Sequence, residues 1–102
     1  MKSLKKIISL SVIALALSGG AVASATTQNA QGGTWNYGYN KPINAYSEYY
    51  HGYNKHGARV VNRNNGVTST ANQYRGVWAR ASINTIWDPA SFYYNPTGFY
   101  QN

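Results

Sequence analysis

The chain has 102 residues and a formal net charge of +7, with nine lysines and arginines, two acidic residues and no cysteine. This length allows one small domain and excludes a multidomain architecture. Disulfides cannot stabilise the fold, and two carboxylates with two histidines leave few ways to build a catalytic centre. All fifteen aromatic residues follow Ala25, so we expect aromatic packing to stabilise a thin core.

Residues 1–25 have the three parts of a secretory signal peptide: three lysines, an apolar stretch over residues 7–17, and small residues. The apolar stretch is shorter than the roughly 20 residues that span a bilayer, so it predicts a signal and not a transmembrane anchor. The pair at residues 19–20 also occurs in double-glycine leaders, but those are acidic and this segment is not. We predict cleavage after Ala25, with Ala23 as second choice, and a secreted chain of net charge +4.

The first half of the predicted mature chain begins with polar residues 26–32, which show no period and predict a flexible arm before a β-domain over residues 33–102. Residues 34–39 alternate aromatic and polar side chains, which is the period of a strand. The tyrosines of residues 45–53 have helical spacing, but we predict a strand that forms a hairpin with residues 58–62.

In the second half, residues 67–73 predict a loop or a short edge strand. Residues 76–83 give the clearest strand, with apolar residues at odd positions and Trp78 and Arg80 at even positions. Residues 90–94 predict a return strand with alternating faces. Short strands between turns are typical of an all-β fold, here a small antiparallel β-sandwich or barrel.

Catalytic and metal sites are disfavoured by the few residues that could form them. Glu48 and Asp88 are the only possible acid pair for a glycosidase, and we expect a surface charge and a turn former instead. His51 and His56 share no face of a regular element, and a metal would need a third ligand, so we expect solvated or interface histidines. We predict no enzyme, no cofactor and no metal.

Cations interleaved with aromatic residues are typical of nucleic-acid binding, but an exported chain would meet other anions, such as wall polymers, lipid head groups and phosphorylated wall precursors. Arginine binds phosphate through a fork of donors, and aromatic rings stack on sugars. The alternative is that the rings pack in the core or a dimer and the arginines only solubilise. The candidate ligand-binding residues are Trp35, Arg59, Arg63, Arg75, Trp78, Arg80, Tyr93 and Tyr94.

Five stretches taken together resemble the lactococcin 972 family of secreted bacteriocins: GTWNYG at 33–38, AYSEYYHG at 45–52, ARVVN at 58–62, GVWARA at 76–81 and ASFYYN at 90–95. The resemblance implies a small β-sandwich, a homodimer and arrest of sensitive Gram-positive cells without pores. In the family's type member the target is the wall precursor lipid II, and septum assembly is blocked.

The chain departs from the type member in a tail after Asn95 and in Tyr50 and Tyr53, which enlarge the aromatic set. We therefore expect a non-enzymatic bacteriocin that binds lipid II or another anionic envelope component. The alternative is a non-toxic surface module that binds the cell wall or a carbohydrate.

Overall fold

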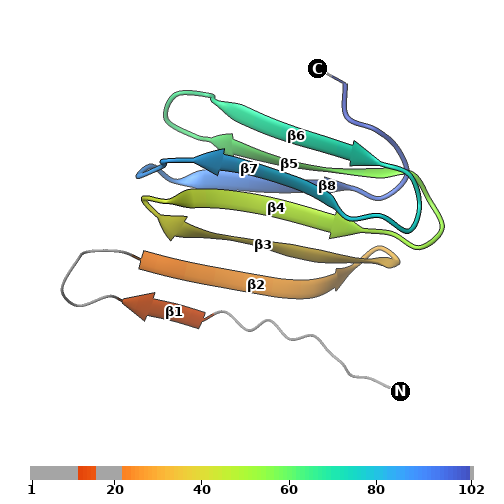
Figure 1. Ribbon diagram of the computed structural model, residues 1–102, viewed down its shortest axis with the longest axis horizontal. Helices are drawn as coiled ribbons and strands as arrows, with labels where there is room; N and C mark the ends of the chain where they lie inside the picture. Colours follow the sequence, from red (N-terminus) through yellow and green to blue (C-terminus); the bar gives the residue numbers. More distant parts are fainter. Residues whose placement is uncertain (1–11, 16–21, 102) are drawn as a thin grey trace.

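The computed structural model describes residues 12–15 and 22–101, and these residues form strands and loops without a helix. The strands make a five-stranded sheet of order β1-β2-β3-β4-β7 and a three-stranded sheet of order β6-β5-β8, and all neighbours are antiparallel (Figure 1). The all-β sandwich prediction is confirmed. The bounds are β1 Val12–Leu15, β2 Val22–Ala30, β3 Gly33–Lys41, β4 Asn44–Tyr50, β5 His56–Asn62, β6 Thr68–Gln73, β7 Ala79–Asn84 and β8 Ala90–Asn95.

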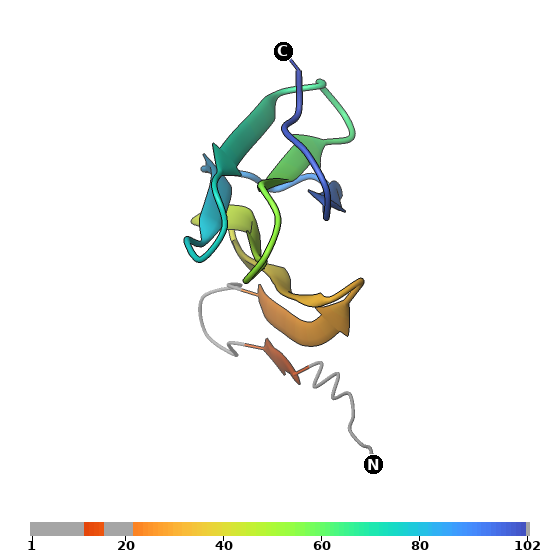
Figure 2. The ribbon, with the colours of Figure 1, turned by 90° about the vertical axis from the view of Figure 1, so that its right-hand side faces the viewer.

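The smaller sheet covers only part of the larger one. Strands β4 and β7 contact β5, and β8 contacts β3 and β4. Among the described elements β2 contacts only β1 and β3, and the ribbon in Figure 2 shows β1 and β2 extending away from the second layer. The core therefore lies between β3, β4 and β7 on one side and β5 and β8 on the other.

Alternation along the strands decides which side chains enter this core. The odd-numbered residues of β4 and β7 face the second sheet and are buried, while their neighbours are more exposed. The alanines on β7 are small, so the two sheets approach closely and leave room for rings elsewhere. The buried apolar residues are Ala30, Ala45, Tyr49, Ala58, Val60, Ala79, Ala81, Ile83 and Ile86.

Tyr49 is the largest side chain that is fully buried in this core. Its ring centroid lies 4.8 Å from that of Tyr94 and 5.7 Å from that of His56, and its hydroxyl donates to Ala30 O at 2.6 Å. A Cβ at Gly33 would lie 2.6 Å from this hydroxyl, so the glycine is required for the close approach. Burial, and then the neighbouring Tyr94, raises the pKa of Tyr49 to about 12.

This raised pKa predicts a loss of stability in alkaline solution. The folded-state pKa lies above that of the unfolded chain, so the contribution of the neutral Tyr49 phenol is complete below pH 10 and is lost as pH rises through about 12. We expect a fall of about 3 kcal/mol in unfolding free energy from this residue across that interval. Urea unfolding at stepped pH measures it: the stability advantage of the protein over Tyr49→Phe shrinks and then reverses as pH approaches 12. A constant difference between the two proteins would contradict the assignment.

The strand predictions are confirmed in position but not in all pairings. Residues 34–39 and 90–94 lie within β3 and β8, residues 79–83 lie within β7, and residues 67–73 give the edge strand β6. Residues 76–78, which were predicted to begin the strand of residues 76–83, instead form the turn before β7. The predicted hairpin of residues 45–53 with residues 58–62 is wrong, because β4 and β5 belong to different sheets. The reason lies in the loop: Nδ1 of buried His51 accepts hydrogen bonds from the backbone N–H groups of Tyr53 and Asn54 and turns the chain to the other layer. Strand β8 likewise returns in the other sheet and pairs with β5, not with β7.

The flexible arm predicted for residues 26–32 is also wrong for residues 26–30, which continue β2 along β3 up to the pair Ala30 and Gly33. This strand is held by backbone ladder bonds and contacts no second layer, so its side chains show no apolar period. The predicted cleavage residues Ala23 and Ala25 lie within β2, and most of the predicted leader, residues 1–11 and 16–21, lies outside the described residues.

Candidate functional site

The eight residues predicted to bind a ligand do not form one site. The structure places them in the core, on the outer face of each sheet and on loops. Trp35 and Tyr94 pack against the core, with their ring centroids 4.7 Å apart. The Trp35 indole N–H donates to the Ser47 hydroxyl at 2.9 Å, which in turn donates to Tyr93 O. The Trp35 ring on β3 and the Tyr94 ring on β8 therefore join the two sheets.

Arg59 and Tyr93 are cross-strand neighbours on the outer face of the three-stranded sheet. Arg59 donates to the Thr70 hydroxyl at 3.1 Å and to Gln101 O at 3.0 Å, and its guanidinium lies 4.3 Å from the centre of the Tyr100 ring. Its donors are thus directed at the C-terminal tail, residues 96–101.

The tail crosses this face and is fastened to it at several points. Asn72 Nδ2 donates to Tyr100 O at 3.1 Å, and Tyr100 N donates to Asn72 Oδ1 at 2.8 Å. The Asn72 side-chain amide thus pairs with both backbone groups of Tyr100, as the backbone of an adjacent strand would. The Tyr100 ring lies over Gly57, where a Cβ would come within 2.8 Å of it. Burial raises the pKa of Tyr100, although the Arg59 charge acts in the opposite direction. The tail is therefore an ordered part of the domain.

Truncation after Asn95 is expected to lower the unfolding free energy by about 3 kcal/mol. It removes the two Asn72 hydrogen bonds and the ring beneath Arg59, each of which contributes about 1 kcal/mol. Urea unfolding measures the change, with Gln101→Ala as the control because Arg59 uses only the backbone carbonyl of that residue. Equal stability of the truncated and complete proteins would mean that the tail is not bound in solution.

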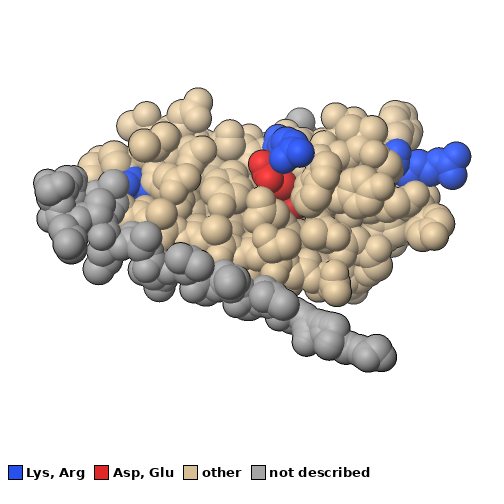
Figure 3. Space-filling view, turned by 60° about the horizontal axis from the view of Figure 1, so that its bottom comes forward, with Lys and Arg blue, Asp and Glu red and all other residues tan. Residues whose placement is uncertain are grey.

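Arg63 and Arg75 lie at opposite ends of the smaller sheet. Arg63 follows the end of β5, and Arg75 follows β6 beside the start of β5. On the face drawn in Figure 3 the basic side chains are separated by uncharged surface, and one of them adjoins an acidic side chain. These two arginines therefore do not share one phosphate site.

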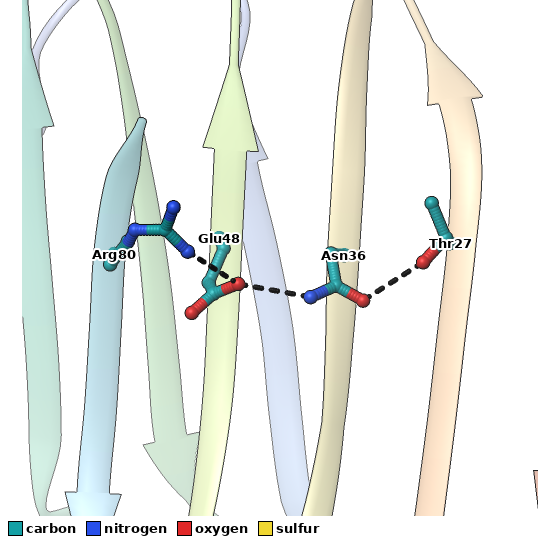
Figure 4. A network of polar contacts seen from close by, with 4 residues as sticks. All are labelled: Thr27, Asn36, Glu48 and Arg80. Atoms are coloured by element: carbon teal, nitrogen blue, oxygen red, sulfur yellow. Dashed lines mark hydrogen bonds and ion pairs between the residues drawn. The ribbon is translucent and has the colours of Figure 1, made fainter. Parts of the chain in front are cut away.

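Trp78 and Arg80 lie on the outer face of the five-stranded sheet. The Arg80 guanidinium lies 5.2 Å from the centre of the Trp78 ring, and Arg80 Nη1 lies 3.1 Å from Glu48 Oε1. The same oxygen accepts from Asn36 Nδ2 at 2.9 Å, and the Thr27 hydroxyl donates to Asn36 Oδ1, which completes a polar row across four strands (Figure 4). Burial, and then the charge of Glu48, raises the pKa of Tyr46 on this face.

Next to this row is a pocket of about 480 Å³ that the sequence analysis did not place. The Tyr50 ring forms one wall and packs against Trp78, with centroids 5.6 Å apart. The unusual number of tyrosines in residues 45–53 was the one available signal, but sequence did not give their faces. The pocket is lined by Asn29, Gly32, Gly33, Thr34, Tyr50, Gly52 and Tyr53.

The expectation of solvated or interface histidines is wrong. His51 is 5% exposed and His56 is fully buried. Each ring nitrogen of His56 lies near a carbonyl oxygen, Nδ1 at 2.8 Å from Asn54 O and Nε2 at 2.7 Å from Val77 O, so the ring joins two loops. No group of three residues suited to hold a metal occurs within the described residues.

The two carboxylates have separate partners. Glu48 belongs to the polar row on β4, whereas Asp88 accepts from Asn62 Nδ2 at 3.1 Å beside the end of β5. In the part of the chain that the structure describes, no helix is long and apolar enough to cross a membrane.

Fold and surface together define a small all-β domain, in which two sheets support a surface pocket lined in part by tyrosines. A family model described as "Bacteriocin (Lactococcin_972)" matches residues 31–94. The solved structure named "Lactococcin 972" is 45% identical, with a TM-score of 0.55, over 67% of this chain and 98% of that chain. The comparison with curated proteins found no match. The chain belongs to the lactococcin 972 family of bacteriocins.

Proposed function

We propose that this protein is a secreted, non-enzymatic bacteriocin that arrests related Gram-positive bacteria by binding the wall precursor lipid II and blocking septum formation. The observation that carries the proposal is the family match, together with 45% identity to lactococcin 972 over 98% of that chain. The signal peptide expected from residues 1–25 supports export to the place where such a receptor is accessible.

The surface chemistry supports recognition of a receptor more than disruption of a membrane by charge. The predicted mature chain has a net charge of only +4, and Arg59 and Arg80 are engaged by the tail and by Glu48. Exposed rings remain available, because Tyr53 is 84% and Tyr93 is 46% exposed. An anionic precursor would then be held at its phosphates by one exposed arginine, Arg63 or Arg75, and at its sugars by the exposed rings.

Addition of protein purified from the medium of an expressing strain to growing Gram-positive cells tests the proposal. We expect arrest at the septum at micromolar concentration and relief by excess lipid II. Wall binding without inhibition of any strain would instead support the alternative, a non-toxic surface module that binds wall carbohydrate. The uncharged aromatic pocket beside Tyr50 is the observation that favours this second candidate.

We also propose that the protein acts as a homodimer, as the family resemblance implies. Sedimentation equilibrium should give twice the monomer mass at micromolar concentration. A monomer mass at every concentration tested would contradict the dimer and leave the proposal of receptor binding unaffected.

A further inference from the structure

We infer that the pocket beside Tyr50 and Tyr53 is a saccharide site that takes a pyranose ring of a neutral glycan, stacked on the exposed aromatic rings. The inference deepens the proposed function, and it rests on that function only for the identity of the glycan. In a wall precursor it would assign the sugars to this pocket and leave the phosphates to groups elsewhere.

The size and position of the pocket suit such a ligand. Its volume of about 480 Å³ lies within the roughly 300–1,000 Å³ typical of small-molecule sites. It lies where the β2–β3 turn meets the chain that leaves β4, at the same end of the sheet as Trp78. Trp78, whose ring packs against Tyr50, therefore lies within reach of a sugar chain that extends beyond the pocket.

The aromatic surface has the chemistry that sugars require. Tyr53 is 84% exposed, although a ring of this size would gain stability from burial. Tyr50 and Trp78 add a second, partly buried pair of rings, with centroids 5.6 Å apart. The face of an aromatic ring carries negative charge density, which attracts the polarised C–H groups on one face of a pyranose.

The lining of the pocket favours a neutral ligand over a phosphate. It consists of one side-chain amide, one hydroxyl, three glycines and two phenols, and it contains no lysine or arginine. The nearest cation of the polar row, Arg80, is paired with Glu48 at 3.1 Å. An anion would lose hydration here without a partner charge, whereas the hydroxyl groups of a sugar find Asn29 and Thr34.

The walls of the pocket are held in place before a ligand arrives. His51 Nδ1 accepts from Tyr53 N and Asn54 N, each at 3.1 Å, and so fixes the backbone that carries the exposed ring. On the other side Gly32 turns the chain with a φ of 87°, and a Cβ there would lie 3.1 Å from His51 Nε2. Weak contacts to a sugar then suffice, because little ordering of the protein accompanies binding.

An NMR titration of the purified protein with tetra-N-acetylchitotetraose tests the inference, with inorganic pyrophosphate as the second probe. We expect the sugar to shift the backbone resonances of Gly52 and Tyr53 and the Trp78 indole, and pyrophosphate to leave them unchanged. Shifts of these signals by pyrophosphate, or no shift by the sugar, would overturn the inference.

Substitutions at Tyr53 test whether stacking of the sugar on this ring is the source of the binding affinity. Tyr53→Ala should weaken sugar binding at least tenfold without unfolding the protein, because the ring is exposed, and Tyr53→Phe should stay within threefold of the unchanged protein. Trp87→Ala is the matched control, because this ring is also exposed, at 63%, but lies far from the pocket. It adjoins Ile86, whose backbone N–H donates a hydrogen bond to Pro42 O at the other end of β4. Unchanged affinity of Tyr53→Ala would overturn the inference.

The outcome is distinguishable from that of the proposed function. If the protein binds lipid II vesicles and arrests cells but ignores the soluble sugar, the saccharide site is wrong and the bacteriocin proposal stands. If it binds the sugar at Tyr53 but neither lipid II nor cells respond, the site stands and the receptor is wrong.

Discussion

Tyr49→Ala is expected to lower the unfolding free energy by about 3–5 kcal/mol, the usual range for removal of a large buried ring. The ring is completely buried between the sheets, where it contacts Tyr94 and His56, and its removal leaves a cavity beside these two rings. The hydroxyl bond to Ala30 O is lost as well, and with it a link between the core and β2. In a domain this small, such a loss removes much of the total stability.

Urea unfolding followed by tryptophan fluorescence measures the effect. Tyr49→Phe isolates the hydroxyl and should cost about 1–2 kcal/mol, because Ala30 O then has no phenol donor. Tyr53→Ala provides the control for loss of a tyrosine, and it should change stability by less than about 0.5 kcal/mol because the ring is exposed. A similar effect of both alanine variants would contradict the assignment of Tyr49 to the core.

His56→Phe is expected to lower the unfolding free energy by about 1–3 kcal/mol even though it retains most of the ring volume. The change removes the ring nitrogens that lie 2.8 Å from Asn54 O and 2.7 Å from Val77 O, and a buried carbonyl that loses its N–H donor costs about 1–3 kcal/mol. The loops that the ring joins would also separate, because they belong to connections between different pairs of strands.

Thermal and urea unfolding measure this second effect, with Val77→Ala as its control. That substitution shortens a side chain that is 48% exposed and keeps the carbonyl that His56 contacts, so stability should stay within about 0.5 kcal/mol. Equal stability of His56→Phe and the unchanged protein would show that packing, and not the two polar contacts, explains the burial of His56.

The fold was predictable where one side chain face is apolar. The alternation in residues 76–83 predicted one shared face for Val77, Ala79, Ala81 and Ile83. The last three lie in the core, whereas Val77 lies in the turn before β7 and is 48% exposed. Phe92 and Tyr94, which were predicted to share a face, both pack against the core. Pairing between strands was not predictable, because a chain that leaves β4 can return in either sheet. A buried histidine that binds backbone N–H groups decides this choice, and composition gives no sign of it.

The candidate site was predictable only as a set of residue types. Arg80 and Tyr93 are exposed and Trp78 is partly buried, and sequence could not show that Arg59 is engaged by the tail or that Trp35 joins the sheets. The pocket escaped prediction for a physical reason. It depends on the turn between β2 and β3, and the polar residues of β2 show no period from which this turn could be placed.

Binding to vesicles distinguishes recognition of lipid II from attraction by charge alone. Protein purified from culture medium would be titrated with two neutral phosphatidylcholine preparations, one with lipid II, and with anionic phosphatidylglycerol vesicles. If the protein recognises lipid II, it should bind saturably to the vesicles with lipid II and bind little to the phosphatidylcholine vesicles without it or to the phosphatidylglycerol vesicles. Equal binding to lipid II and phosphatidylglycerol vesicles would mean that charge alone drives association, and this result would contradict receptor recognition.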